Sequence, residues 1–125
     1  MSRQILYIVD NQDNRTLVRR VLQSEGYLVC EAVDGPSGLK MAAEQPPDLV
    51  LMDINLPEID GYEVTARLKQ LPGMSDVPVI AVTANVMKGD REKTLAAGCD
   101  GYIQKPIDID LLGNQIEHFL TRNKS

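Results

Sequence analysis

The sequence predicts an α/β domain: a five-stranded parallel sheet in the order 2-1-3-4-5, with five helices on its two faces. Three observations support this class. Short apolar runs alternate with helical patterns along the chain, which is typical of βα units. Several of these runs end at a polar or charged residue. The length of 125 residues suits one domain, expected to span residues 1–125 without an output domain.

The first half of the chain supplies three strands and two helices. Residues 5–9 form an apolar run that ends at Asp10. The helical pattern that follows has its apolar positions at Leu17, Val18, Val21 and Leu22, and it ends near Gly26. Residues 27–32 predict a short outer strand. Asp34 is placed to open a second helix, which Pro46-Pro47 ends. The run Leu49-Val50-Leu51-Met52-Asp53 then predicts a buried strand.

The second half continues the alternation. Helices are expected over residues 62–71 and 88–97, and strands over 79–82 and 102–104. The apolar stripe of residues 88–97 is the weakest of the set. A last helix carries apolar residues at nearly helical spacing, with a polar outer side; these are Ile109, Leu112, Ile116 and Phe119.

Four side chains that can bind a metal or a phosphoryl group stand at the ends of four different predicted strands: Asp10, Asp53, Thr83 and Lys105. Ligands of open α/β sheets bind outside the carboxyl ends of the strands. The predicted strand order and crossover handedness bring these ends to one edge. Two acids, a hydroxyl and a lysine at that edge predict a site for Mg²⁺ and a phosphoryl group.

Bulk properties exclude several functional classes. The formal net charge is −5 and the pI is about 4.8, which argues against direct binding to nucleic acid or to an anionic membrane surface. No apolar stretch approaches the ~20 residues of a membrane span, and the first strand leaves no room for a signal peptide. A cytoplasmic protein is expected. Cys30 and Cys99 lack metal-ligand or redox spacing.

At this point the residues match a family. The chain resembles the receiver domain of bacterial two-component response regulators, over essentially its full length. The matching segments are residues 5–11, 49–57 with Asp60-Gly61, 79–84, and Gly101-Tyr102-Ile103-Gln104-Lys105-Pro106. Each segment alone is weak evidence for the family, but the four segments in this order and at these intervals are a specific match. Residues 84–90 resemble the stand-alone, DivK-like receivers and the receivers of hybrid kinases.

The resemblance implies a role for each candidate residue. Asp53 would accept a phosphoryl group from a phosphohistidine of a sensor histidine kinase or a histidine phosphotransfer protein. Mg²⁺ would be held by Asp10, Asp53 and the backbone carbonyl of Asn55. The phosphoryl oxygens would meet Lys105, the Thr83 hydroxyl and the Ala84 backbone N–H.

The resemblance also implies a switch. Thr83 would move toward the phosphoryl group, and the Tyr102 ring would turn inward to fill the space. The face formed by the fourth helix, fifth strand and fifth helix would be remodelled, which would control a downstream protein partner or a phosphorelay. The chain would not be an enzyme beyond its own phosphorylation and dephosphorylation, and would be a monomer or weak dimer.

One position departs from the family pattern. Receivers usually carry two adjacent acids after the first strand, whereas this chain has Val9 before Asp10. The second acid is the direct metal ligand in the family, so Mg²⁺ binding is expected to persist but to weaken.

Three other functions compete with the switch. A degenerate receiver, acting as a phosphorylation-independent interaction module, is favoured by Val9 and disfavoured by the retention of Asp53, Thr83 and Lys105. An aspartate-nucleophile phosphatase would resemble Asp-x-Asp at the first strand, which is absent. A flavin-binding protein would need a Ser/Thr/Gly-rich phosphate loop, whereas residues 10–14 include two acids.

Overall fold

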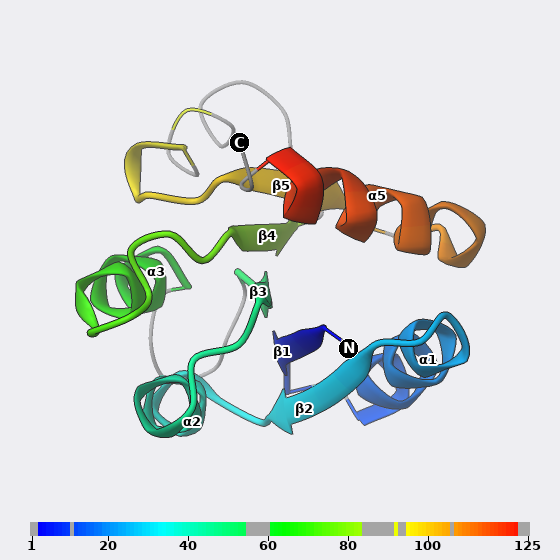
Figure 1. Cartoon of the computed structure of the whole chain (residues 1–125), viewed down its shortest axis with the longest axis horizontal. Coiled ribbons are helices and arrows are strands. Elements are labelled where there is room, and N and C mark those ends of the chain that lie inside the picture. Colours follow the sequence, from blue (N-terminus) through cyan, green and yellow to red (C-terminus); the bar gives the residue numbers. More distant parts are fainter. Residues whose placement is uncertain are drawn as a thin grey trace.

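The computed structural model describes residues 3–10, 12–54, 61–83, 92, 95–105 and 107–122, without the side chains of residues 12–14 and 122. Five parallel strands form one sheet in the order β2-β1-β3-β4-β5, which confirms the predicted topology (Figure 1). The strands are β1 (Gln4–Ile8), β2 (Leu28–Ala32), β3 (Leu49–Asp53), β4 (Val79–Thr83) and β5 (Gly101–Gln104).

Helices cover both faces of the sheet (Figure 1). Helices α1 (Gln12–Ser24) and α5 (Ile109–Arg122) pack on one face, and α2 (Gly35–Glu44) and α3 (Gly61–Gln70) pack on the other. Every residue of β3 and β4 is buried, as expected for central strands of a parallel sheet. The helix expected over residues 88–97 lies largely outside the described residues, although 92, 95 and 96 are helical.

Local sequence signals place the helix ends as predicted. The Asp34 side chain accepts a 2.8 Å hydrogen bond from the Ser37 backbone N–H and caps α2. Helix α1 ends two residues before Gly26, whose φ of 95° lies in the left-handed region that glycine tolerates. These helix-end signals depend on residues that are close in the sequence, so they can be predicted without knowledge of the tertiary packing.

Two residues of the predicted apolar stripes lie outside the core. Leu17 of α1 is 47% exposed and Ile109 of α5 is 40% exposed. The helical repeat identifies which face of a helix is apolar. How much of that face is buried depends on the neighbouring elements that pack against it. Leu17 and Ile109 lie at the margins of their faces, while Val18, Leu22 and Leu112 are buried.

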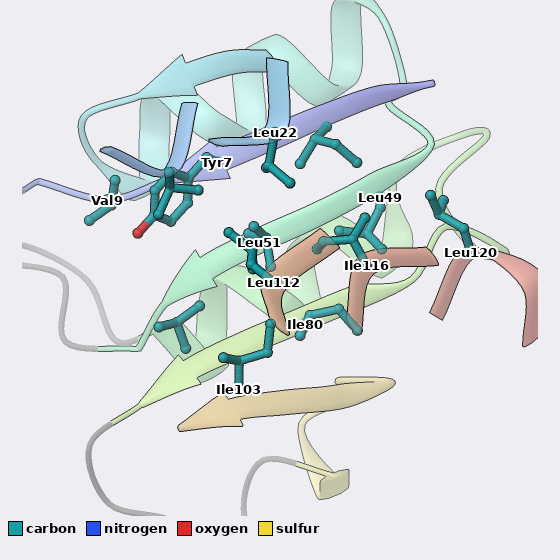
Figure 2. Packing of buried hydrophobic residues seen from close by; sticks show 13 residues of the cluster. Tyr7, Val9, Leu22, Leu49, Leu51, Ile80, Ile103, Leu112, Ile116 and Leu120 are labelled. Carbon is teal, nitrogen blue, oxygen red and sulfur yellow. The ribbon is translucent and has the colours of Figure 1, made fainter. Parts of the chain in front are cut away.

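A cluster of buried hydrophobic residues, hereafter the α1/α5 cluster, fills the space between one face of the sheet and the helices α1 and α5 (Figure 2). Its buried members are Ile5, Tyr7, Val9, Val18, Leu22, Leu49, Leu51, Ile80, Val82, Ile103, Leu112, Ile116 and Leu120. None of the helices in the described part of the chain is long and apolar enough to cross a membrane.

Candidate functional site

The site is organised around an ion pair at the carboxyl edge of the sheet. Asp53 is the last residue of β3, and Lys105 follows β5 directly. The Lys105 Nζ donates to Asp53 Oδ2 at 2.8 Å. The Asp53 carboxylate is almost fully buried, whereas the Lys105 side chain is partly exposed. Burying a carboxylate is costly unless a cation or hydrogen-bond donor meets it, and Lys105 provides both.

Backbone pairing determines where Lys105 lies. Strand β5 pairs with β4, so that Thr83 lies opposite Gln104. The Lys105 backbone N–H then donates to the Thr83 carbonyl at 2.8 Å. The lysine is therefore held at the end of the sheet, and its side chain reaches across β4 to Asp53. Thr83 itself is 3% exposed. The two hydrogen bonds of Lys105 show that Asp53, Thr83 and Lys105 lie at one edge of the sheet, as the sequence predicts.

Asp10 lies at the same edge but in a different environment. It follows β1 and is exposed. The residue before it, Val9, is buried in the α1/α5 cluster, and its backbone N–H donates to the Ala32 carbonyl at 3.0 Å. Position 9, where a second carboxylate would stand in the family pattern, is therefore occupied by an aliphatic side chain that packs in the core.

The donor chemistry of this edge fits a hard cation. Asp10 and Asp53 offer carboxylate oxygens, which Mg²⁺ prefers over nitrogen or sulfur ligands. Among the described residues no group of three His, Cys, Asp or Glu side chains could hold a metal ion. A cation here would therefore need a further ligand such as a backbone carbonyl. The expected carbonyl of Asn55 and the expected phosphate donor at Ala84 lie outside the described residues.

Tyr102, the expected switch residue, lies on β5 and is half-buried. It lines a surface pocket of about 260 Å³ together with residues of α5, among them Leu111, His118 and Phe119. Tyr102 lies opposite Ala81 in β4, two residues before Thr83. The two expected switch residues therefore lie on paired strands.

Tyr7 is a further residue that approaches the site. It is almost fully buried, and burial together with the negative charge of Asp53 raises the pKa of its hydroxyl well above the usual value. The sequence pattern predicts Tyr7 only as a strand residue. The register of β1 against β3, which places Tyr7 opposite Leu51, is the signal that relates it to Asp53.

The two cysteines lie away from this edge. Cys99 is buried before β5, and burial raises the pKa of its thiol. The Gln4 side-chain amide approaches the Cys30 Sγ at 2.9 Å. Both are free thiols.

Comparison with known proteins gives a consistent result. The family model of the response regulator receiver domain matches residues 5–117. The polar-differentiation response regulator DivK of Brucella ovis is 41% identical to this chain over 120 residues, which cover 96% of this chain and 98% of the relative. The DivK protein of Brucella anthropi matches with the same identity and coverage.

Solved structures show the same fold. The receiver domain of the sensor histidine kinase PA1611 from Pseudomonas aeruginosa, with a magnesium ion coordinated in its active site cleft, is 36% identical with a TM-score of 0.89. The match covers 97% of this chain and 99% of that domain. The chemotaxis response regulator CheY4 of Vibrio cholerae has a TM-score of 0.91 at 24% identity, covering 95% and 99% of the two chains, and supports the fold alone.

Proposed function

The chain belongs to the response regulator receiver domain family, and we propose that it is a phosphoryl-accepting signalling switch with Asp53 as the phosphoacceptor. The observation that carries this proposal is the Lys105–Asp53 pair at the carboxyl edge. A buried carboxylate held by a cation, beside a buried threonine, supplies a nucleophile and donors for phosphoryl oxygens in one place.

The transfer is a substitution at phosphorus. A carboxylate oxygen of Asp53 forms a bond to phosphorus while the bond from phosphorus to a histidine nitrogen breaks. The electron pair of the broken bond stays on the imidazole, which takes up a proton, and Asp53 becomes an acyl phosphate. The donor is a phosphohistidine on a sensor histidine kinase or a phosphotransfer protein. Because the reaction modifies the chain itself, the protein catalyses only its own phosphorylation and dephosphorylation.

Each residue has a defined part in this reaction. Lys105 can follow a phosphoryl oxygen from its position beside Asp53, as a mobile point charge. The Thr83 hydroxyl would donate to a second oxygen, and the backbone N–H of Ala84 is the other donor that the family resemblance implies. Asp10, Asp53 and the Asn55 carbonyl would hold Mg²⁺, which neutralises charge on the phosphoryl oxygens when bound.

Phosphorylation would be read out at the face that carries Tyr102 and α5. Thr83 turns toward the phosphoryl group, and Tyr102 turns inward behind it. The half-buried position of Tyr102 and the pocket between it and α5 support this step, because the ring has a partly solvated side from which to move. A downstream protein partner, or the next protein of a phosphorelay, would distinguish the two states.

Intact-mass measurement tests the proposal. The protein is incubated with Mg²⁺ and acetyl phosphate, and in parallel with a phosphorylated histidine kinase. A mass gain of one phosphoryl group in the wild type, and none in Asp53→Asn, is expected. A gain that persists in Asp53→Asn would refute Asp53 as the acceptor.

A second candidate function is favoured by Val9 alone. A receiver with one acid fewer at its metal site could act as a phosphorylation-independent interaction module. This function predicts no mass gain from either donor, together with unchanged partner binding in Asp53→Asn.

A further inference from the structure

Three interactions hold Val9, the residue immediately before the proposed metal ligand Asp10. The Val9 side chain is buried in the α1/α5 cluster at the carboxyl end of the sheet (Figure 2). Its backbone N–H donates to the Ala32 carbonyl at 3.0 Å. Its own carbonyl accepts a hydrogen bond from Nη1 of Arg15 at 3.4 Å. The side chain and both backbone polar groups of Val9 are therefore bound to different parts of the fold.

The hydrogen bond from Arg15 crosses the turn between β1 and α1. Arg15 lies in the first turn of α1, six positions after Val9. Its guanidinium group is always charged and holds its donors in a rigid plane, so its hydrogen bonds are directional. The bond therefore ties the start of α1 to the end of β1 across the segment that carries Asp10.

The orientation of the Val9 carbonyl affects the direction of the Asp10 side chain. The carbonyl of Val9 and the backbone N–H of Asp10 belong to one planar peptide unit. A hydrogen bond that fixes the carbonyl also fixes this plane, from which the Asp10 residue starts. Asp10 is exposed, so packing restrains its carboxylate little, and the position of the carboxylate depends on the backbone.

We propose that Arg15 is a positioning residue that holds the backbone at Asp10 in place for Mg²⁺ binding. The inference rests on the proposed function, since Mg²⁺ belongs to the phosphoryl-transfer site. Mg²⁺ demands nearly ideal octahedral geometry, so it is sensitive to the placement of its carboxylate ligands. In this chain Val9 gives Asp10 no acidic neighbour on its N-terminal side, which increases the dependence of the site on the placement of Asp10.

Charge and position predict opposite effects of removing Arg15. A guanidinium group near a Mg²⁺ site repels the metal ion, so the loss of its charge alone should tighten Mg²⁺ binding. The loss of its hydrogen bond should weaken binding, because the peptide before Asp10 gains freedom that the metal must then remove. The sign of the change in affinity therefore separates a positioning residue from a nearby charge.

The first test is a calorimetric titration with Mg²⁺ alone, without a phosphodonor. Arg15→Gln removes the charge and shortens the side chain, so that it no longer reaches the Val9 carbonyl. Arg20→Gln is the matched control, because it makes the same change at an exposed position of α1, where solvent and salt screen the charge.

We expect Arg15→Gln to weaken Mg²⁺ binding at least about threefold, less than the largest effects of residues that support metal ligands. The hydrogen bond is long for an N–H donor and an oxygen acceptor, which favours an effect of this modest size. Arg20→Gln should bind Mg²⁺ like the wild type. Unchanged or tighter binding in Arg15→Gln would overturn the proposal.

The second test needs no metal. In ¹⁵N-labelled protein, the order parameter of the Asp10 backbone N–H reports how firmly its peptide plane is held. We expect this order parameter to fall in Arg15→Gln and to match the wild type in Arg20→Gln. An unchanged value in Arg15→Gln would contradict the proposal.

The third test separates metal binding from phosphoryl transfer. The phosphorylation rate is measured with saturating acetyl phosphate and increasing Mg²⁺. Arg15→Gln should raise the half-saturating Mg²⁺ concentration by a larger factor than it lowers the maximal rate. A fall in the maximal rate alone would show that Arg15 acts on the transfer step, and would also overturn the proposal.

These measurements separate the inference from the proposed function. If the wild type accepts phosphate while Arg15→Gln binds Mg²⁺ like the wild type, the inference on Arg15 fails and the proposed function stands. If the wild type binds Mg²⁺ but accepts no phosphate from either donor, the proposed function fails, while weaker Mg²⁺ binding in Arg15→Gln still supports the role of Arg15. A wild type that binds no Mg²⁺ would overturn the inference on Arg15.

Discussion

The Nζ atom of Lys105 lies 2.8 Å from the Oδ2 atom of Asp53, with side-chain exposures of 26% and 5%. The two partners are unequally buried. The carboxylate is almost fully removed from water, so Lys105 must offset the free energy of its desolvation. The ammonium group retains part of its hydration. Removing the lysine should therefore cost more stability than removing the aspartate charge.

The variant Lys105→Met tests this asymmetry. Methionine keeps most of the side-chain length but leaves the Asp53 charge without its cation. We expect unfolding free energy to fall by about 1–3 kcal/mol, at the lower end because solvent screens the partly exposed lysine. Urea denaturation at pH 7 measures the change.

Two further variants control this measurement. Lys40→Met changes an exposed lysine of α2 and should alter stability by less than ~0.5 kcal/mol. Asp53→Asn should suppress the cost of Lys105→Met, because no buried charge then remains. If Lys105→Met is equally costly in both backgrounds, its effect comes from lost packing and the charge argument is wrong.

The departure at Val9 gives a prediction about metal affinity. Val9→Asp would restore a second acid next to Asp10, and the Coulomb energy of one added charge pair at 4 Å is about 4 kcal/mol at an effective dielectric of 20. Part of this is lost to desolvation, since Val9 is buried. We expect Mg²⁺ to bind about tenfold more tightly. Calorimetric titration suits a chain without tryptophan.

Val9→Asn is the matched control, since it adds polarity at nearly the same volume without charge. It should leave the Mg²⁺ affinity near the wild-type value, and both variants should lose stability in the absence of metal because a polar group enters the core. Equal Mg²⁺ affinity in Val9→Asp and the wild type would count against a metal site at this edge.

The location of the site at the carboxyl edge of the sheet could be predicted from the sequence, because it depends only on where the strands end. Asp53, Thr83 and Lys105 end three runs, and parallel strands bring their carboxyl ends together. The pairing of Lys105 with Asp53 could not be predicted, since it requires the lysine side chain to cross β4. That crossing follows from the bond between the Lys105 N–H and the Thr83 carbonyl.

Register and packing width were the parts that the sequence left open. The approach of Tyr7 to Asp53 follows from the register of β1 against β3, and a shift by one residue would turn Tyr7 to the opposite face. Similarly, the exposure of Leu17 and Ile109 depends on how far neighbouring elements extend over α1 and α5. Both are tertiary properties that a periodic pattern within one segment does not contain.

Two helical glycines should respond in opposite ways to a methyl group. A Cβ at Gly38 of α2 would collide with Cδ1 of Ile8 and lie 2.8 Å from its Cγ1. Ile8 is fully buried in the sheet, so its side chain could move only by displacing packed neighbours. Gly38→Ala should therefore lower the unfolding free energy by about 1–3 kcal/mol, measured by urea denaturation.

Gly113 of α5 is the matched control. The three atoms nearest to a Cβ there all belong to the carboxylate of Glu25, whose side chain is exposed and can rotate away. Gly113→Ala should be neutral, or stabilising by up to ~1 kcal/mol through helix propensity. Ile8→Val removes Cδ1 and should reduce the cost of Gly38→Ala. An equal cost at both glycines would contradict the steric explanation.

The Tyr27–Glu117 hydrogen bond should make stability fall at alkaline pH. The Tyr27 hydroxyl donates to Glu117 Oε2 at 2.9 Å and joins the turn after α1 to α5. Burial, this hydrogen bond and the nearby negative charges raise the pKa of Tyr27 from 10.0 to about 12. Between these values the unfolded chain releases the phenolic proton while the folded chain retains it, so stability falls as pH rises.

Comparison with Tyr27→Phe isolates this contribution, because other groups that titrate in the same range, including Tyr7, are present in both proteins. We expect the stability of the wild type relative to Tyr27→Phe to be constant from pH 7 to 9 and to decrease from pH 10 to 12, as measured by urea midpoints. Glu117→Gln keeps an acceptor but removes its charge, which lowers the pKa of Tyr27 toward 10 and reduces the decrease. Parallel curves for the wild type and Tyr27→Phe would show that the hydroxyl titrates alike in the folded and unfolded chains.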